Sequence, residues 1–355
     1  MDLITESLSG RLAVGLLTRV YPPHLVEHAV RVSGRAGQRN RLLPPAKTVY
    51  FVLAMCLFTG VPYEQVAGVL SDGLTWVEPN LLNFAAGRPG QIPSTAAISR
   101  ARRRLGSEPL KALFRAVTSE QEELYSARGR RFGRWWLKSL DGGTTAVSPS
   151  KENLAWFGST PGGAPGHVRV SALAQCGTGL LQDVEVMADL GGAPPASPAM
   201  LARLGPGDLV LADAPYAAAG AWAQATATGA QLLWTQPADA RLLPLRRLAD
   251  GSTLHVFEPP HGEATTVRVL DGPPGGRPLM TTLLDPHVAP APDLRSIHAD
   301  RWRFGAALDE LRAQRPGPPM DLRSRSPEMV EQEVWGHVLV YCAIRSVMNW
   351  KHNVL

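Results

Sequence analysis

The sequence predicts an α/β protein in which an all-helical N-terminal part precedes a mixed sheet. Residues 11 to 125 show one helical segment after another, whereas residues 135 to 290 show mostly short strands, so we expect a boundary near 127 to 134. The chain has 355 residues and is 45% apolar, which is enough for a large buried core and for two domains.

The composition indicates an intracellular protein without a membrane span. Its cysteines lie far apart, without the spacing of a disulfide framework or a zinc site, which fits a reducing compartment: Cys56, Cys176 and Cys342. The longest apolar run, Val49 to Phe58, has ten residues and is too short to cross a bilayer, and no signal-peptide pattern opens the chain. We therefore expect a cytoplasmic, nucleoid-associated protein with no membrane partner.

The net charge of +5 is unevenly distributed along the chain. Residues 1 to 138 hold 19 lysines and arginines against 10 acidic residues, a net +9, and the remainder carries −4. A basic first part favours a polyanionic partner such as a nucleic acid, but soluble domains rich in arginine often have the same balance. Charge alone therefore leaves DNA binding and an ordinary basic surface equally open.

Helix signals follow one another through the first part. Two prolines precede the apolar run and Gly60 follows it, and a short helix, "YEQVAGVL", comes next. Ser94 caps a helix that ends at Gly106, and Ser107 with Pro109 begins another. Arginines crowd the end of the helix after Ser94, where they either contact a DNA backbone or form a solvated helix end: Arg100, Arg102, Arg103 and Arg104.

Strand signals follow the boundary. A hydrophobic strand ends at Asp141, and we expect a tight turn at Gly142 and Gly143 before a second strand. The next two strands form a hairpin that turns at 177 to 179. Asp213 comes directly after a buried strand, and "GAQLLW" supplies a further one. Helical segments flank these strands at 199–204 and 220–228, an alternation that predicts a mixed sheet.

Asp141 and Asp213 thus stand at the ends of two neighbouring strands. Carboxylates that converge in this way suit a pair of divalent cations, which bind hard oxygen ligands and catalyse phosphoryl transfer. Alternatively, Asp141 is only a turn residue and Asp213 only caps the following helix. The two residues taken separately favour this structural interpretation.

The segment "HADRWRFGAALDELRAQRPG", His298 to Gly317, predicts one amphipathic helix. Its apolar face consists of Phe304, Ala307, Leu308 and Leu311, and a second stripe consists of His298, Arg301, Gly305 and Arg312. A glycine inside a helix costs about 1 kcal/mol relative to alanine. Gly305 therefore either permits close packing or marks the loss of a side chain.

Several blocks resemble, in order, those of insertion-sequence-4 family DDE transposases: "PSTAAISRARRRLG", "SLDGGTTAV", "LVLADAPY", "TTLLDP", "HADRWRF" with "ALDELR", and "LRSRSPEMVEQEVWG". The resemblance spans about residues 20 to 350. It implies a helical DNA-binding domain at 1–130 and a ribonuclease-H-like domain at 131–355, with a β-rich insertion at about 236–292. Relatives continue for several more helices, so the C-terminal region is expected to be truncated.

The resemblance implies that Asp141 and Asp213 are catalytic residues and metal ligands. The family's last catalytic helix bears Tyr, Arg, Glu and Lys, and these fall on His298, Arg301, Gly305 and Arg312, so the third acid is missing. Arg301 and Arg312 are the basic members expected at the DNA. Asp309 is the one candidate substitute, but it lies about 6 Å along the helix from position 305, and Mg²⁺ needs oxygens near ~2.1 Å.

Other departures from the family also remove positive charge, because Ala214 replaces a usual arginine and Thr235 to Pro237 replaces a stretch that commonly leads into a lysine. We expect a transposase-family DNA-binding protein, related to cut-and-paste DNA transposition, with impaired catalysis. The alternatives are an active DDE transposase that uses Mg²⁺ or Mn²⁺ to cut and join DNA, and a domesticated DNA-binding regulator. The expected partners are double-stranded DNA and a second copy of the chain, since such transposases work as dimers on paired ends.

Overall fold

The computed structural model describes residues 8–36, 43–77, 92–125, 128–159, 166–189, 196–214, 216, 218–259, 263–307 and 322–350. The chain forms two compact units, and each is discontinuous in sequence. A helical unit combines Met1–Glu123, Thr145–Val168 and Leu308–Leu355, and a sheet unit combines Leu124–Thr144 and Arg169–Ala307. The family-based boundaries at 1–130, 131–355 and 236–292 stay predictions.

The helices of the helical unit are α1 (Leu8–Val20), α2 (Pro23–Val32), α3 (Pro45–Leu57), α4 (Tyr63–Val77), α5 (Thr95–Leu105), α6 (Glu108–Tyr125), α7 (Lys151–Phe157) and α12 (Pro327–Trp350). The end signals of α5 are as the sequence predicted. The Ser94 hydroxyl accepts a hydrogen bond from the Ala97 N–H at 3.4 Å, and Gly106, with φ of 69°, ends the helix.

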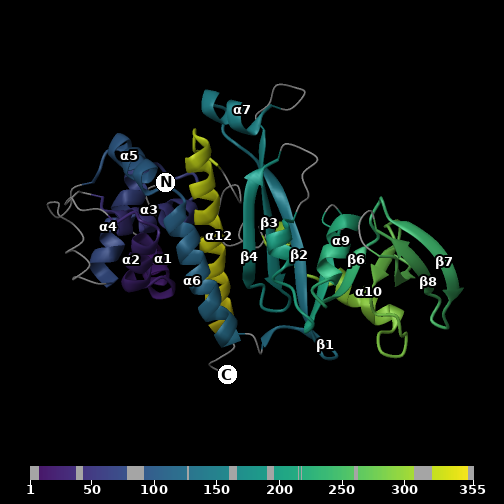
Figure 1. Ribbon diagram of the computed structural model, residues 1–355. Helices are drawn as coiled ribbons and strands as arrows, with labels where there is room; N and C mark the ends of the chain where they lie inside the picture. The colour runs from purple at the N-terminus through teal and green to yellow at the C-terminus, as the bar shows by residue number, and fades with distance from the viewer. Residues whose placement is uncertain are drawn as a thin grey trace. The chain divides into compact units, whose positions relative to one another are not determined.

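Helix α3 is the buried helix that its apolar run predicted, and α12 packs along it (Figure 1). At Gly336 of α12 an added Cβ atom would lie 2.6 Å from the Cys56 Sγ atom, so this glycine permits the close approach of the two helices. Neither these helices nor any other in the described ranges is long and apolar enough to cross a membrane.

The strands are β1 (Arg131–Phe132), β2 (Trp135–Ala146), β3 (His167–Gln175), β4 (Leu181–Ala188), β5 (Asp208–Ala212), β6 (Gln231–Thr235), β7 (Arg241–Arg247), β8 (Thr253–Glu258), β9 (Thr265–Leu270) and β10 (Leu279–Thr281). They form one mixed sheet in the order β4-β3-β2-β5-β6-β10-β9-β8-β7, with β1 paired to β2. Strands β2, β5 and β6 are parallel, and β6 to β7 pair antiparallel through β10, β9 and β8.

The turn expected at Gly142 and Gly143 is wrong, because β2 continues through both residues. An added Cβ at Gly142 would lie 2.1 Å from the Tyr216 hydroxyl oxygen and 2.1 Å from the Val170 carbonyl oxygen. The glycine therefore permits close packing across the strand. The hairpin expected at 177 to 179 is confirmed, with φ of 93° at Gly177 and 69° at Gly179.

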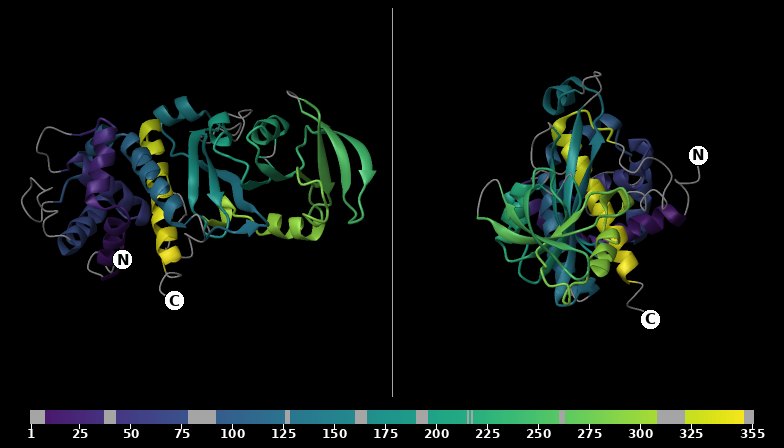
Figure 2. Two further views of the ribbon diagram at one scale, coloured as in Figure 1. Left: turned by 60° about the horizontal axis from the view of Figure 1, so that its bottom comes forward. Right: turned by 90° about the vertical axis from the view of Figure 1, so that its right-hand side faces the viewer.

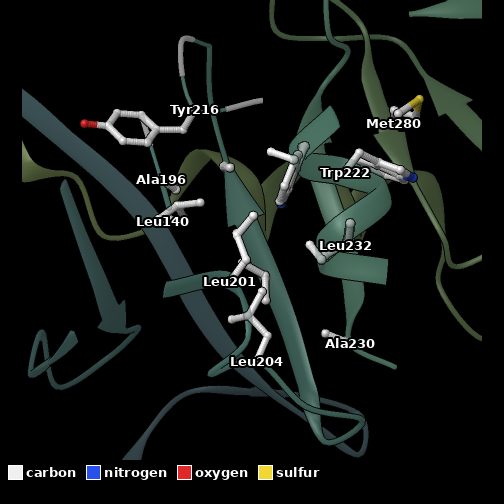
Figure 3. Close-up of a cluster of buried hydrophobic side chains, with 14 of the residues drawn as sticks. Leu140, Ala196, Leu201, Leu204, Tyr216, Trp222, Ala230, Leu232 and Met280 are labelled. Carbon is white, nitrogen blue, oxygen red and sulfur yellow. The ribbon is translucent and has the colours of Figure 1, made fainter. Parts of the chain in front are cut away.

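Helices α8 (Pro198–Leu201), α9 (Ala219–Thr226) and α10 (Ala291–Ala299) complete the described part of the sheet unit. Helices α9 and α10 lie on opposite faces of the sheet, as the right-hand view of Figure 2 shows. The core under α9 centres on Trp222, whose ring stands edge-on to that of Trp234 at 5.4 Å and to that of Phe257 at 6.2 Å. Leu140 and Tyr216 belong to the same buried cluster (Figure 3), which anchors the ends of β2 and β5.

Candidate active site

The parallel register of β2 and β5 brings Asp141 and Asp213 to the same level of the sheet. Leu140 of β2 pairs with Ala212 of β5, and Asp141 and Asp213 directly follow these two residues in the sequence. The sequence predicted this proximity from the strand ends. The reason is the parallel register and not a common strand end, because β2 continues to Ala146 whereas β5 ends at Ala212.

The Asp141 carboxylate is held by two backbone groups. One oxygen accepts the Gly142 N–H at 2.8 Å, and the other accepts the Phe304 N–H at 3.1 Å. Burial raises the pKa of Asp141, although both N–H groups and the nearby Arg301 oppose this shift. Asp141 thus sits at the start of the helical turn at 304–307, where a carboxylate is favourable.

Asp213 has the opposite electrostatic setting. Burial acts to raise its pKa, but the Thr235 hydroxyl, the Arg301 guanidinium and the Ala214 N–H together outweigh burial and hold the pKa below its ordinary value. One oxygen accepts from Thr235 and, at 3.0 Å, from the Ala214 N–H, and the other forms an ion pair with Arg301. The sequence indicated only a lost positive charge at Thr235, because its position beside Asp213 depends on the parallel pairing of β5 and β6.

His298 and Arg301 form the third side of the site. The His298 Nε2 atom lies 3.0 Å from the Ala212 carbonyl oxygen, and burial lowers the pKa of this imidazole. The Arg301 Nη1 group donates to the His298 carbonyl at 2.8 Å, while its buried Nε has no hydrogen-bond partner in the described residues. Arg301 is therefore positioned by the end of α10 and directed at Asp213.

The single helix expected from His298 to Gly317 is wrong in the described part of that range. Helix α10 ends at Ala299, and helical backbone resumes only at 304–307. Tertiary contacts account for the break, because Trp302 is buried and its carbonyl accepts the Ser139 hydroxyl at 2.7 Å. Asp309 and Arg312, the other residues predicted on this stripe, lie outside the described residues.

Gly305 has no packing reason to be glycine. A Cβ atom built there meets nothing within 4 Å, the residue is exposed, and its φ is not positive. The close-packing interpretation of Gly305 is therefore wrong.

The described side chains around Asp141 and Asp213 do not form a ligand set for a pair of divalent cations. The described residues contain no group of three His, Cys, Asp or Glu side chains able to hold a metal ion. All four oxygens of Asp141 and Asp213 already accept hydrogen bonds or face Arg301, whose guanidinium supplies the positive charge beside Asp213.

The four arginines of α5 do not share one role. Arg102 is 0% exposed and donates to Gln332, Tyr63 and Ser324, so it is not available to a DNA phosphate, which corrects the sequence-based expectation. A sequence signal existed, because Ile98, Arg102 and Leu105 share one helical face. The other three arginines are exposed: Arg100, Arg103 and Arg104.

The fold and the site define a mixed α/β protein with two acidic residues at the same level of adjoining parallel strands, one inside β2 and one directly after β5. Residues 11–115 match the family model described as "Insertion element 4 transposase N-terminal". The chain is 25% identical over 371 residues to "Transposase InsG for insertion sequence element IS4" of Escherichia coli (strain K12), covering 98% of this chain and 79% of that relative. The chain is therefore similar to insertion-sequence-4 transposases, in its N-terminal part by the family model and over most of its length at 25% identity.

A solved structure is also similar at low level. It is that of the piggyBac transposase in a synaptic complex with hairpin DNA, with a TM-score of 0.43 and 9% identity over 99% of this chain and 76% of that chain. A likeness this weak carries no conclusion about the present fold.

Proposed function

We propose that the protein is a DNA-binding transposase relative that has lost Mg²⁺-dependent strand cleavage. In this proposal the sheet unit is a ribonuclease-H-like DDE domain, with Asp141 and Asp213 as its two remaining acids. Residues 1–130 form the DNA-binding part and 131–355 the former catalytic part, with the insertion at about 236–292. The similarity of the chain to insertion-sequence-4 transposases supports the ancestry, and the paired register of β2 and β5 supports the two acids.

The observation that carries the loss of cleavage is the open space around Gly305. The family resemblance aligns this position with the third acid, and neither packing nor backbone conformation requires a glycine there. A divalent ion would supply a polarised oxygen nucleophile and stabilise the leaving oxygen in active relatives. Two carboxylates with Arg301 between them would bind such ions poorly.

DNA binding in this proposal begins at the exposed end of α5. Arg100, Arg103 and Arg104 remain candidates for phosphate contacts, together with Arg301 and with Arg312 outside the described residues. The expected partners are double-stranded DNA and a second copy of the chain on paired ends, which would give a nucleoid-associated protein.

The test is incubation of the purified protein with a duplex that carries its cognate transposon end, with Mg²⁺ or Mn²⁺. We expect retention of the duplex in a mobility-shift assay and no metal-dependent nicking. Metal-dependent nicking that Asp141→Ala and Asp213→Ala both abolish would refute the proposed loss. Absence of any duplex binding would refute the proposed DNA-binding role.

The same experiment includes a variant that replaces the missing acid. Gly305→Glu is sterically allowed, and we expect it to bind Mn²⁺ at least about tenfold more tightly than the unmodified protein in a calorimetric titration, equivalent to about 1.4 kcal/mol. Gly305→Gln is the matched control, since it adds the same bulk without charge. Equal Mn²⁺ affinity in all three proteins would show that position 305 does not limit metal binding.

A further inference from the structure

The β1–β2 hairpin concentrates arginines that no part of the proposed site uses. Within seven residues, Arg128, Arg130, Arg131 and Arg134 are all exposed. Phe132 pairs with Trp135, which leaves Gly133 and Arg134 as a two-residue loop, and Gly133 has the positive φ of 54° that such hairpin loops favour at their first position. Figure 1 shows β1 beside the start of β2.

Two of these guanidinium groups are held by aromatic rings. The Arg131 Cζ atom lies 4.4 Å from the centre of the Trp136 ring, and that of Arg134 lies 4.9 Å from the Trp135 ring. Arg131 also donates to the Arg134 carbonyl at 2.9 Å. Stacking fixes the plane of a guanidinium and leaves its N–H edge available for a phosphate. In the described part of the chain, no ion pair joins Arg131 or Arg134 to a carboxylate.

The hairpin presents these groups on both of its faces. Trp135 and Trp136 are consecutive in a strand, so their side chains point to opposite faces, and each carries one stacked arginine. A flat anionic surface would contact one face only. A duplex groove has phosphates on both walls, and the major groove, about 12 Å wide, admits a two-stranded ribbon.

The hairpin is separate from the acidic site but adjoins the same segment. Seven residues of extended strand place Arg134 about 23 Å from Asp141, which matches about seven base pairs at ~3.4 Å each. Arg130 lies beside the strand between them, because its carbonyl accepts the Leu137 N–H at 2.9 Å, and its side chain forms an exposed ion pair with Asp300, the residue before Arg301. A duplex that contacts the hairpin could therefore continue along β2 toward Arg301.

We infer that the β1–β2 hairpin is a DNA-contacting ribbon, in which Arg131 and Arg134 bind backbone phosphates on the two walls of a groove. The inference rests on the proposed DNA-binding function and adds a surface to it. Each phosphate contact that is lost should lower the dependence of log affinity on log salt by about 0.9.

The experiment measures the affinity of the full-length protein for a fluorescent duplex of about 30 base pairs. Fluorescence anisotropy gives this affinity across a range of salt concentrations. We expect the double variant R131Q/R134Q to reduce the slope by about 1.8. The matched control is R246Q/R247Q on β7, which removes the same charge from exposed positions of the same unit and should leave the slope nearly unchanged. R131K/R134K should retain the slope, because each lysine keeps the point charge.

Equal slopes for the unmodified protein and R131Q/R134Q, with both folded by circular dichroism, would overturn the inference while leaving DNA binding intact. An equal reduction in the β7 control would also overturn it, since net charge alone would then explain the effect. Loss of binding to phosphatidylserine vesicles in R131Q/R134Q, with an unchanged duplex slope, would assign the hairpin to a membrane surface instead. If the unmodified protein binds no duplex, both this inference and the proposed function fail.

Discussion

At the scale of single residues, the two aspartates show how neighbours set opposite charge behaviour. Asp141 is held mainly by backbone N–H groups in a buried position that raises its pKa, whereas the Thr235 hydroxyl and Arg301 overcome burial and lower the pKa of Asp213. The ion pair of Asp213 matters to Arg301 as well, because the arginine side chain is only 9% exposed. Removing the acid leaves a largely buried guanidinium without its partner.

We predict that Asp213→Asn lowers the free energy of unfolding by about 1 kcal/mol at neutral pH, a modest value because Asp213 is 41% exposed. A carboxyl group with a depressed folded pKa contributes stability above its unfolded pKa, and this contribution is lost as pH falls through the folded pKa. The difference between the two proteins should therefore shrink as pH falls below the ordinary aspartate pKa of 3.8, and vanish below the lower pKa of Asp213 in the folded protein.

The measurement is denaturant unfolding of both proteins between neutral pH and about pH 3, the range that spans the titration of an aspartate. The pKa of Asp141 is raised, so its contribution to the pH dependence of stability has the opposite sign to that of Asp213. Asp141 is present in both proteins. Asp271→Asn, at an exposed position of the same unit, is the control and should change stability by less than about 0.5 kcal/mol. A difference independent of pH would contradict the linkage of Asp213 to Arg301.

At the scale of elements, α5 and α12 are joined by a buried polar network. The Arg102 guanidinium donates to Gln332 at 2.9 Å, to the Tyr63 hydroxyl at 2.6 Å and to the Ser324 hydroxyl at 2.9 Å. Gln332 donates back to the carbonyls of Arg102 and Gly106, at 2.9 and 2.7 Å. The end of α5 is thereby fixed to α12 by groups that all depend on one side chain.

We predict that Arg102→Ala lowers the free energy of unfolding by about 3 kcal/mol or more, since it leaves several buried polar groups without their partner. Arg103→Ala, at the adjacent exposed position, should change stability by less than about 0.5 kcal/mol. Denaturant unfolding of the two variants gives the comparison. Similar small losses in both would show that the buried network does not stabilise the helical unit.

At the scale of the whole molecule, the helical unit draws on both ends of the sequence. Helix α12 is apolar on most of its length, with Val334, Leu339 and Val340 almost fully buried, and it packs against α3 and α5. The Tyr21 hydroxyl, near the other end of the chain, donates to the Leu339 carbonyl at 2.6 Å. The N-terminal helices therefore complete their core with a segment more than 300 residues away.

We predict that residues 1–123 alone do not melt cooperatively, because α12 would be missing from their core. Addition of a peptide of residues 322–355 should restore a cooperative transition and reduce binding of a hydrophobic dye. Circular dichroism melting with and without the peptide makes the comparison. Cooperative melting of residues 1–123 alone at the melting temperature of the full chain would refute this dependence.

The sequence by itself determined the helical first part, the mixed sheet, the caps of α5 and the proximity of Asp141 and Asp213. These features depend on local periodicity, on capping chemistry and on the common direction of parallel strands, all of which neighbouring residues encode. It also contained the signal that buries Arg102, in the helical face shared with Ile98 and Leu105.

Tertiary structure alone decided the unbroken strand at Gly142, the helix break before Phe304 and the partnership of α12 with the N-terminal helices. The physical reason is common to all three, because each depends on contacts between residues far apart in the chain. Tyr216 and Val170 approach Gly142, Ser139 holds the Trp302 carbonyl, and Arg102 bonds to Gln332. Local patterns that favour a turn or a continuous helix are weaker than these buried contacts, which only the folded chain brings together.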